Sequence, residues 1–135
     1  MTNSNVAVGE ILDVLSATKT AVVNTYSRNG RVTYVLSIIN GGTTDITSRT
    51  ISDNLGAYSF GDTTVVPLTY IDGSIRYYVN GALQPAPTVT AGTGLVITGI
   101  SIPAGGNATL IYEAIINEFA PLGTADFITN VARIT

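Results

Sequence analysis

The sequence predicts an all-β domain, most simply an immunoglobulin-like antiparallel β-sandwich, and three observations predict it. Short runs rich in Thr, Val, Ile and Tyr recur every 8–14 residues, a spacing typical of sandwich strands. Turn residues, above all Asn-Gly and Asp-Gly, separate these runs. No segment carries a convincing helical pattern, and 135 residues suffice for one domain with a single core.

Composition excludes several classes of function. Hydrophobic residues make up 45% of the chain and charged residues only 11%, and the net charge is −3. Six basic residues are too few for a nucleic-acid-binding surface or for attraction to anionic lipid, and no apolar run is long enough to insert in a membrane. The chain has no cysteine and no histidine, so disulfides, His or Cys metal sites and His-based triads are absent. We expect no cofactor, no metal site and no enzymatic activity.

The expected strands follow the chain in order. Alternating or apolar runs predict them at residues 15–23, 32–39, 45–55, 68–71, 74–79, 82–84, 95–102, 107–117 and 127–135. Residues 58–64 are expected to be irregular, residues 85–87 to break the sheet, and Gly99 to interrupt its strand. Before this domain, residues 1–14 form a leader, in which Val6 and Val8 favour a strand while Ile11 and Val14 also fit a helical face.

Three polar groups fall within apolar rows of these strands. Lys19, the only lysine, alternates with Ala17 and Ala21, while Asp53 and Asn130 interrupt similar rows near the middle and the end of the chain. A buried amine must be neutral, paired or chemically consumed. An amine, a carboxylic acid and a carboxamide are the three parts of a self-forming Lys–Asn isopeptide bond. The simpler interpretation is that one of the rows is misjudged and these groups reach the surface.

Five sequence blocks resemble a known family. They are Lys19-Thr20-Ala21, Val32-Thr33-Tyr34 running to Ile39-Asn40-Gly41-Gly42, Ile51-Ser52-Asp53-Asn54-Leu55, Pro103-Ala104-Gly105-Gly106 and Ile128-Thr129-Asn130-Val131-Ala132. Over residues 16–135 the chain resembles the conserved-repeat domain of bacterial surface proteins, a domain-of-unknown-function family found mostly as arrays on adhesins and envelope proteins. The resemblance implies an immunoglobulin-like domain with a structural role, outside the cell on a cell or spore surface, although this chain carries no signal peptide.

The resemblance also implies roles for the polar trio. The family pattern places a lysine in the first strand, an acid in the middle strand and an asparagine in the last, which here are Lys19, Asp53 and Asn130. Burial lowers the pKa of an amine and raises that of a carboxylic acid, so neutral forms coexist near pH 7. Neutral Lys19 is then expected to attack Asn130 while Asp53 acts as the acid, with Glu113 in reserve as the alternative acid. The reaction happens once per chain, so the protein does not count as an enzyme.

The leader suggests how copies of the chain assemble. A single repeat with a leader is unusual in a family of arrays, and the leader could complete the sandwich of a neighbouring subunit. In this prediction Val6, Val8 and Ile11 belong to a donor strand that pairs with an acceptor strand containing Ile128, Ala132 and Ile134. Repeated head to tail, the contact gives a homopolymeric fibre. The alternative is a leader folded back onto its own sandwich.

A stand-alone adhesin, or a module that binds glycan or protein, is the rival function. Tyr58, Tyr70, Tyr77 and Tyr78 lie in the hairpin region, where exposed tyrosines make adaptable contacts. Tyrosines at such positions more commonly pack across the strands of a sheet. The sequence identifies no ligand.

Overall fold

The computed structural model describes residues 2–8, 15–21, 29–60, 62–92, 94–118 and 128–135 of the chain. These residues form strands, turns and loops, and no helix. The strands are β1 (Thr2–Val8), β2 (Leu15–Ala21), β3 (Arg31–Asn40), β4 (Ile46–Asp53), β5 (Tyr58–Phe60), β6 (Thr63–Val65), β7 (Leu68–Tyr70), β8 (Arg76–Val79), β9 (Ala82–Gln84), β10 (Thr88–Ala91), β11 (Leu95–Ile102), β12 (Asn107–Ile116) and β13 (Ile128–Ile134). No helix in this described part is long and apolar enough to cross a membrane.

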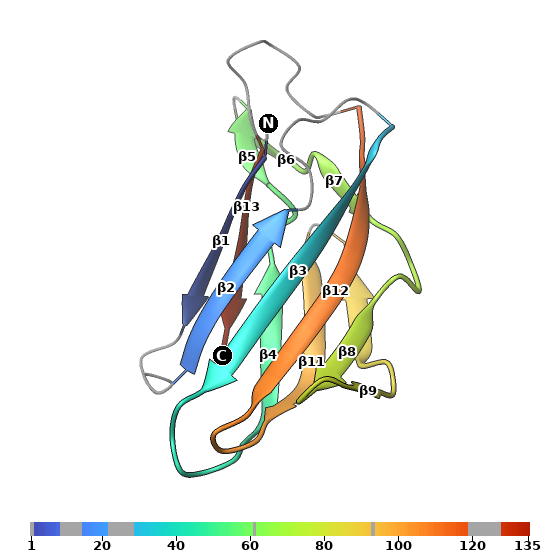
Figure 1. Cartoon of the computed structure of the whole chain (residues 1–135). Helices are drawn as coiled ribbons and strands as arrows, with labels where there is room; N and C mark the ends of the chain where they lie inside the picture. The colour runs from blue at the N-terminus through green and yellow to red at the C-terminus, as the bar shows by residue number, and fades with distance from the viewer. Residues whose placement is uncertain (1, 9–14, 22–28, 61, 93, 119–127) are drawn as a thin grey trace.

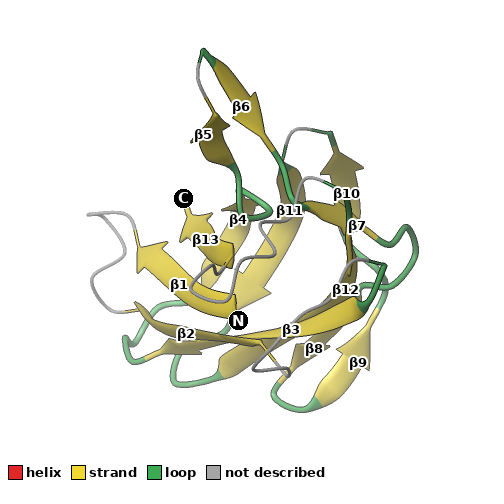
Figure 2. Ribbon diagram, turned by 90° about the horizontal axis from the view of Figure 1, so that it is seen from above, coloured by secondary structure: helices red, strands yellow, loops and turns green. Residues whose placement is uncertain are grey.

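Two sheets pack face to face, which confirms the predicted sandwich (Figure 1). One sheet has the strand order β1-β13-β4-β11-β10, and the other has the order β2-β3-β12-β8-β9, with β7 also paired to β12. All these pairs are antiparallel except β1 with β13, which is parallel. Seen from above, the two sheets curve around a common interior, and β1 lies beside β2 where the sheets approach each other (Figure 2).

Strict alternation along the central strands builds the core. On β3, residues 32, 34, 36 and 38 are fully buried, and on β12 every second residue from Ala108 to Ile116 is buried, so both strands point one face inward. The two strands pair over nine residue pairs, from Asn107 with Ile39 to Ile115 with Arg31. Each fully buried Leu, Ile or Tyr side chain contributes on the order of 1.5–3 kcal/mol of hydrophobic free energy, which fixes the register of the sheet.

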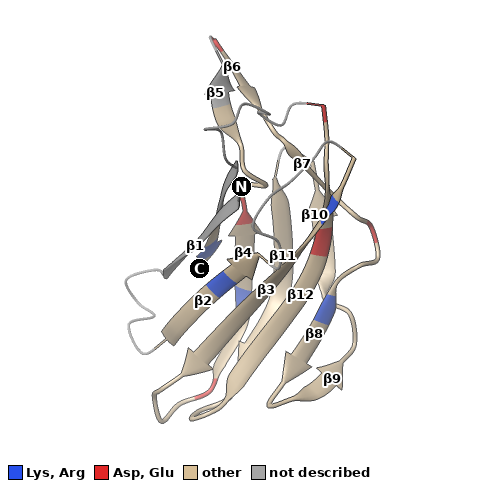
Figure 3. Cartoon of the chain, turned by 45° about the horizontal axis from the view of Figure 1, so that its top comes forward, with Lys and Arg blue, Asp and Glu red and all other residues tan. Residues whose placement is uncertain are grey.

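Two short strand pairs depart from the sequence prediction. Residues 58–64, expected to be irregular, lie in the region of the antiparallel pair β5–β6, which projects from the sandwich (Figure 3). Strand β10 follows the predicted sheet break and pairs with β11 as an edge strand. Three or four residues are too few to establish a period of two, so neither pattern could be recognised.

The predicted interruption at Gly99 is confirmed. The register of β11 against β4 shifts between Ile97 and Ile100, as in a β-bulge, and Gly99 has a φ of +79°. Glycine adopts this conformation without steric cost, whereas other residues do not.

Candidate functional site

Strand β2 places the only lysine of the chain inside the sandwich. Its exposure alternates as predicted, with residues 16, 18 and 20 exposed and the side chain of Lys19 fully buried. Apolar neighbours in the row give the amino group no route to solvent.

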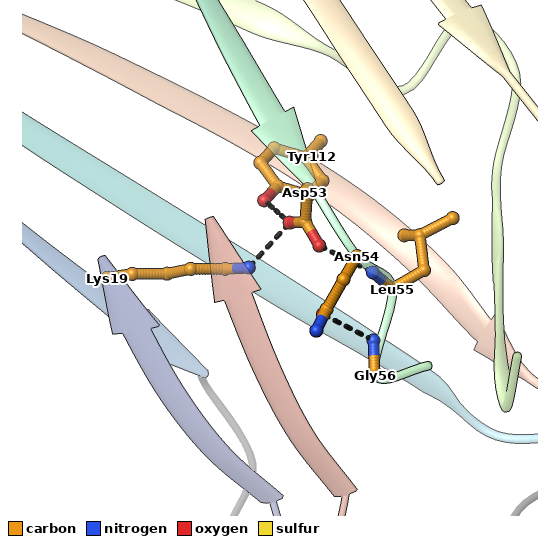
Figure 4. Close-up of polar contacts among 6 residues, drawn as sticks. All are labelled: Lys19, Asp53, Asn54, Leu55, Gly56 and Tyr112. Carbon is orange, nitrogen blue, oxygen red and sulfur yellow. Dashed lines mark hydrogen bonds and ion pairs between the residues drawn. The ribbon is translucent and has the colours of Figure 1, made fainter. Parts of the chain in front are cut away.

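Asp53, the last residue of β4, meets this lysine from the opposite sheet. It is only 2% exposed, and its Oδ2 lies 2.5 Å from Lys19 Nζ. The hydroxyl of Tyr112, on β12, donates a short hydrogen bond to the same oxygen (Figure 4). The other oxygen, Oδ1, accepts the backbone N–H of Leu55 at 2.8 Å. The structure therefore brings Lys19 and Asp53 together, as predicted.

The turn after β4 fixes the position of the carboxyl group. Leu55 is buried in the left-handed region with a φ of +52°, which is uncommon for a bulky residue. Its N–H donates to Asp53, and the N–H of Gly56 donates to Oδ1 of Asn54 at 2.9 Å (Figure 4). These two hydrogen bonds stabilise the turn, and the turn orients the Asp53 carboxyl group.

Two tyrosine rings enclose the amino group of Lys19. Its Nζ lies 4.6 Å from the ring centroid of Tyr34 and 5.8 Å from that of Tyr112. The two rings are tilted by 35°, with centroids 5.9 Å apart. An ammonium over such faces gains cation–π stabilisation, worth more in a dry site. Sequence reasoning missed both tyrosines, because an aromatic residue in an apolar row looks like ordinary core.

The surroundings shift the proton equilibria of the cluster. Burial lowers the pKa of Lys19, although the negative charge of Asp53 and its hydrogen bond act in the opposite direction. Burial, followed by the charge of Asp53, raises the pKa of Tyr112 well above its ordinary value, so the phenol keeps its proton. A lowered lysine pKa favours the neutral amine, which is the nucleophilic form.

The third predicted partner, Asn130, lies in the strand next to Asp53. Ala132 of β13 pairs directly with Asp53 of β4, and Asn130 comes two residues earlier, roughly 7 Å along the same strand. The side chain of Asn130 lies outside the described residues, so its contact with Lys19 stays a prediction.

Glu113, the reserve acid, lies away from the cluster. Its carboxylate accepts a hydrogen bond from Arg31 at 3.3 Å, at a partly exposed position on β12. Tyr112, the preceding residue of the strand, points into the core, so Glu113 faces the opposite side of the sheet.

The predicted donor and acceptor segments lie side by side within the chain. Strand β1 pairs with β13 over seven residue pairs, with Val6 beside Ala132 and Val8 beside Ile134. Ala132 and Ile134 are fully buried. At the other end of the ladder Thr2 pairs with Ile128, while Ile11 falls outside the described residues. In the single chain, residues 2–8 thus pair with the last strand of their own sandwich, as the folded-back alternative expects.

The four tyrosines that suggested a glycan- or protein-binding module are buried or half-buried. Tyr70 and Tyr77 are buried, and Tyr58 and Tyr78 are half-buried. The Tyr77 hydroxyl both donates to the carbonyl oxygen of Ser101 and accepts its N–H, at 2.8 and 2.9 Å. These contacts indicate structural packing. Among the described residues, no group of Asp and Glu side chains is arranged to hold a metal ion.

Comparison with solved structures shows the same fold in surface proteins. The pilus backbone protein RrgB of Streptococcus pneumoniae matches 80% of this chain with a TM-score of 0.60 and 14% identity, over 47% of its own length. A structure of the RrgA Jo.In complex matches 76% of this chain with a TM-score of 0.51 and 11% identity, over 61% of its own length. The chain therefore spans about half to three-fifths of these matched proteins.

Comparisons of the sequence itself are negative. No family model matches the chain, and no curated protein matches it. The resemblance to the conserved-repeat family accordingly stays a prediction. The structural likeness shows that the chain has the immunoglobulin-like fold found in bacterial pilus proteins.

Proposed function

We propose that the protein is a structural subunit of a bacterial extracellular or spore-surface fibre, in which each subunit donates its N-terminal strand to a neighbour. The observation that carries the proposal is the β1–β13 ladder, in which the N-terminal strand is the edge strand of its sheet and pairs with the last strand. The fold shared with a pilus backbone protein supports this class of function.

The same ladder can also form between chains. Strand β1 makes its main contacts with β13 and β2, and the same main-chain hydrogen bonds are available to the β1 of another copy. Pairing by strand addition supplies affinity through the backbone and specificity through alternate side chains. Because the donor and acceptor edges belong to different parts of one subunit, the contact is heterologous and propagates as an open filament.

Charge does not oppose this assembly. In the described part of the chain, charged residues of both signs are few and lie apart from one another on strands and loops (Figure 3). The only lysine is buried, so the surface offers no lysine side chain for a covalent link between subunits. The fibre we propose therefore depends on strand pairing.

The buried cluster adds an internal cross-link. Neutral Lys19 Nζ attacks Cγ of Asn130, while Asp53 gives its proton to the amide oxygen. The surplus proton on Nζ passes through Asp53 to the amide nitrogen, the Cγ–Nδ2 bond breaks and ammonia leaves. As the C=O bond of the new amide re-forms, its oxygen returns the first proton to Asp53, which is then protonated as at the start. Folding supplies the proximity, with an effective molarity that can reach about 10⁵ M.

Assembly is tested by deleting the leader strand. Removal of residues 2–8 should leave a soluble, folded monomer, and a peptide of that segment should bind it and block filament growth. Val6→Asp should act almost like the deletion, because it lies beside buried Ala132, whereas Asn5→Asp, on the alternate face, is the matched control. Electron microscopy with a circular dichroism melt measures both outcomes. A truncated protein that still forms filaments excludes strand donation, and one that aggregates favours the folded-back leader.

The cross-link is tested by intact mass. Loss of one ammonia lowers the mass by about 17 Da, and Lys19→Ala, Asn130→Ala and Asp53→Ala should each restore the full mass. Full mass in the unmodified protein contradicts the bond. A loss of about 18 Da, the mass of water, means that Lys19 has joined Asp53 itself and that Asp53 is not the acid.

The second candidate, a ligand-binding adhesin module, has one observation in its favour. A groove of about 400 Å³ is lined by residues that include Asp45, Thr47, Gln84 and Ser101, which are groups suited to a glycan. Binding to immobilised glycans, lost on Gln84→Ala, would support this function, and its absence together with filaments supports the fibre.

A further inference from the structure

The hydroxyl of Tyr112 is aimed at the one oxygen that also contacts the lysine. Oδ2 of Asp53 receives both Lys19 Nζ, at 2.5 Å, and the Tyr112 hydroxyl, while Oδ1 is held by the Leu55 N–H. The three side chains come from three strands, β2, β4 and β12, in the two sheets (Figure 4). Such a convergence of polar groups in the core requires a reason beyond packing.

Packing alone does not require the hydroxyl. A phenylalanine would fill the same fully buried space against Tyr34. Tyr70 shows that this core accommodates a buried tyrosine hydroxyl with no hydrogen-bond partner among the described residues. The hydroxyl of Tyr112, by contrast, is directed at the carboxyl group, which connects it to the chemistry of Asp53.

The geometry points to Tyr112 as a positioning residue for the cross-linking reaction: it holds Oδ2 of Asp53 beside Lys19 Nζ in both protonation states of the carboxyl group. This inference rests on the proposed isopeptide bond and adds a fourth residue to it.

A phenol suits this task because it both donates and accepts hydrogen bonds. When Asp53 is ionised, Tyr112 donates to Oδ2, and when Oδ2 has taken the proton of Nζ, Tyr112 accepts from it. Lys19 cannot hold the carboxyl group throughout, since its amine turns from Asp53 to attack the amide. Tyr112 keeps its proton across the ordinary pH range, because burial and the charge of Asp53 raise its pKa.

The experiment follows bond formation in the full chain. Protein collected in denaturant directly after synthesis, before the bond forms, is refolded between pH 5 and pH 9 and sampled by intact mass. Tyr112→Phe removes only the hydroxyl and should slow the loss of about 17 Da by about tenfold or more, the worth of a hydrogen bond to a charged group. Tyr70→Phe, the matched control, removes a buried hydroxyl that has no hydrogen-bond partner among the described residues, and it should react at the rate of the unmodified chain.

The pH profile separates positioning from mere structure. Among the described residues, Lys19 on β2 and Tyr112 on β12 contact the Asp53 carboxyl, and Tyr34 on β3 lies beside the Lys19 amino group. Arg133 on β13 lines a pocket together with Asp53. A hydroxyl that donates a hydrogen bond to a carboxylate favours the ionised form of that carboxylate. Because Tyr112→Phe removes this donor, the decline in the rate of bond formation on the alkaline side of the pH–rate profile (the alkaline limb) should move to higher pH. Replacing Tyr112 by 3-fluorotyrosine, which keeps its size and strengthens the donor, should move that limb to lower pH, and this variant serves if Tyr112→Phe does not fold.

The outcomes are distinct. If the unmodified chain loses ammonia and Tyr112→Phe does so at the same rate, the positioning role is wrong while the cross-link stands. The positioning role is also contradicted if Tyr112→Phe reacts slowly but the alkaline limb of its pH–rate profile stays at the pH of the unmodified chain. The hydroxyl would then have only a structural role. If the unmodified chain keeps its full mass, the proposed cross-link fails and the role of Tyr112 fails with it.

Discussion

At the scale of single residues, the buried pair of Lys19 and Asp53 is the most costly feature of the core. Burying two charges costs desolvation free energy, and their mutual attraction offsets this cost only while both partners are present. Asp53→Ala should therefore be about 3–5 kcal/mol less stable than Asn130→Ala, which also lacks the cross-link but keeps the pair, because it leaves Lys19 buried without its carboxylate. Adding Lys19→Met should recover most of that loss. None of these variants can form the cross-link, so urea unfolding compares them directly, and a double variant less stable than Asp53→Ala contradicts the account.

Tyr112 gives a prediction at alkaline pH. Its pKa is raised in the folded chain, so its contribution to stability is complete below pH 10, the ordinary value, and is lost as pH rises toward the folded pKa. Between pH 10 and 11.5 the unfolding free energy should fall by up to about 1.4 kcal/mol per pH unit from this group. In denaturant unfolding, Tyr112→Phe should show a smaller fall of the unfolding free energy with pH than the unmodified protein. If the unfolding free energy falls equally steeply with pH in both proteins, Tyr112 is not the group responsible.

The sequence predicts part of this cluster. Lys19 and Asp53 could be found because a charge within an apolar alternation is conspicuous. Tyr34 and Tyr112 could not, since nothing in a row such as Leu110, Tyr112 and Ala114 distinguishes a functional hydroxyl from core packing. Their role depends on the distance between two sheets, which local pattern does not encode.

At the scale of secondary-structure elements, the bulge in β11 separates two segments of this strand that both pair with β4. Gly99 has a φ of +79°, and a Cβ there meets nothing within 4 Å, so the cost of a side chain is conformational. Gly99→Ala should cost about 1–2 kcal/mol in thermal or urea unfolding. Gly92, also with open space but without a positive φ, is the matched control, and Gly92→Ala should be neutral. Equal effects at the two positions contradict this explanation.

Element prediction was accurate where alternation was long. The ten-residue strands β3 and β12 could be located from their pattern, whereas the three-residue strands β5 and β6 could not. The pairing of the leader with the last strand was expected between neighbouring copies, whereas its parallel direction could not be predicted, because local pattern does not describe how strands more than a hundred residues apart are oriented.

At the scale of the whole molecule, the cross-link that we propose would join the first strand of the sandwich to the last. It would close a loop of about 110 residues, and by analogy with a disulfide of that span it should stabilise the fold by about 4–5 kcal/mol. Asn130→Ala removes the bond but leaves Lys19 and Asp53 paired, so it should lower the unfolding free energy by that amount, while Asn3→Ala should not. Reductant should leave both values unchanged, since an amide is not reduced. A melting temperature within a degree or two of the unmodified protein contradicts a mechanical role for the bond.

The most direct test of the fibre is a cysteine trap in the β1–β13 ladder. Ala7 pairs with Arg133, and neighbouring strands lie about 4.8 Å apart, within the range that a disulfide spans. The chain has no other cysteine, so Ala7→Cys with Arg133→Cys can form only this bond. Oxidised filaments, run on a non-reducing denaturing gel, should give a ladder of covalent multimers that reductant collapses to monomer. A single monomer band that carries the disulfide internally would contradict strand donation and assign β1 to its own sandwich.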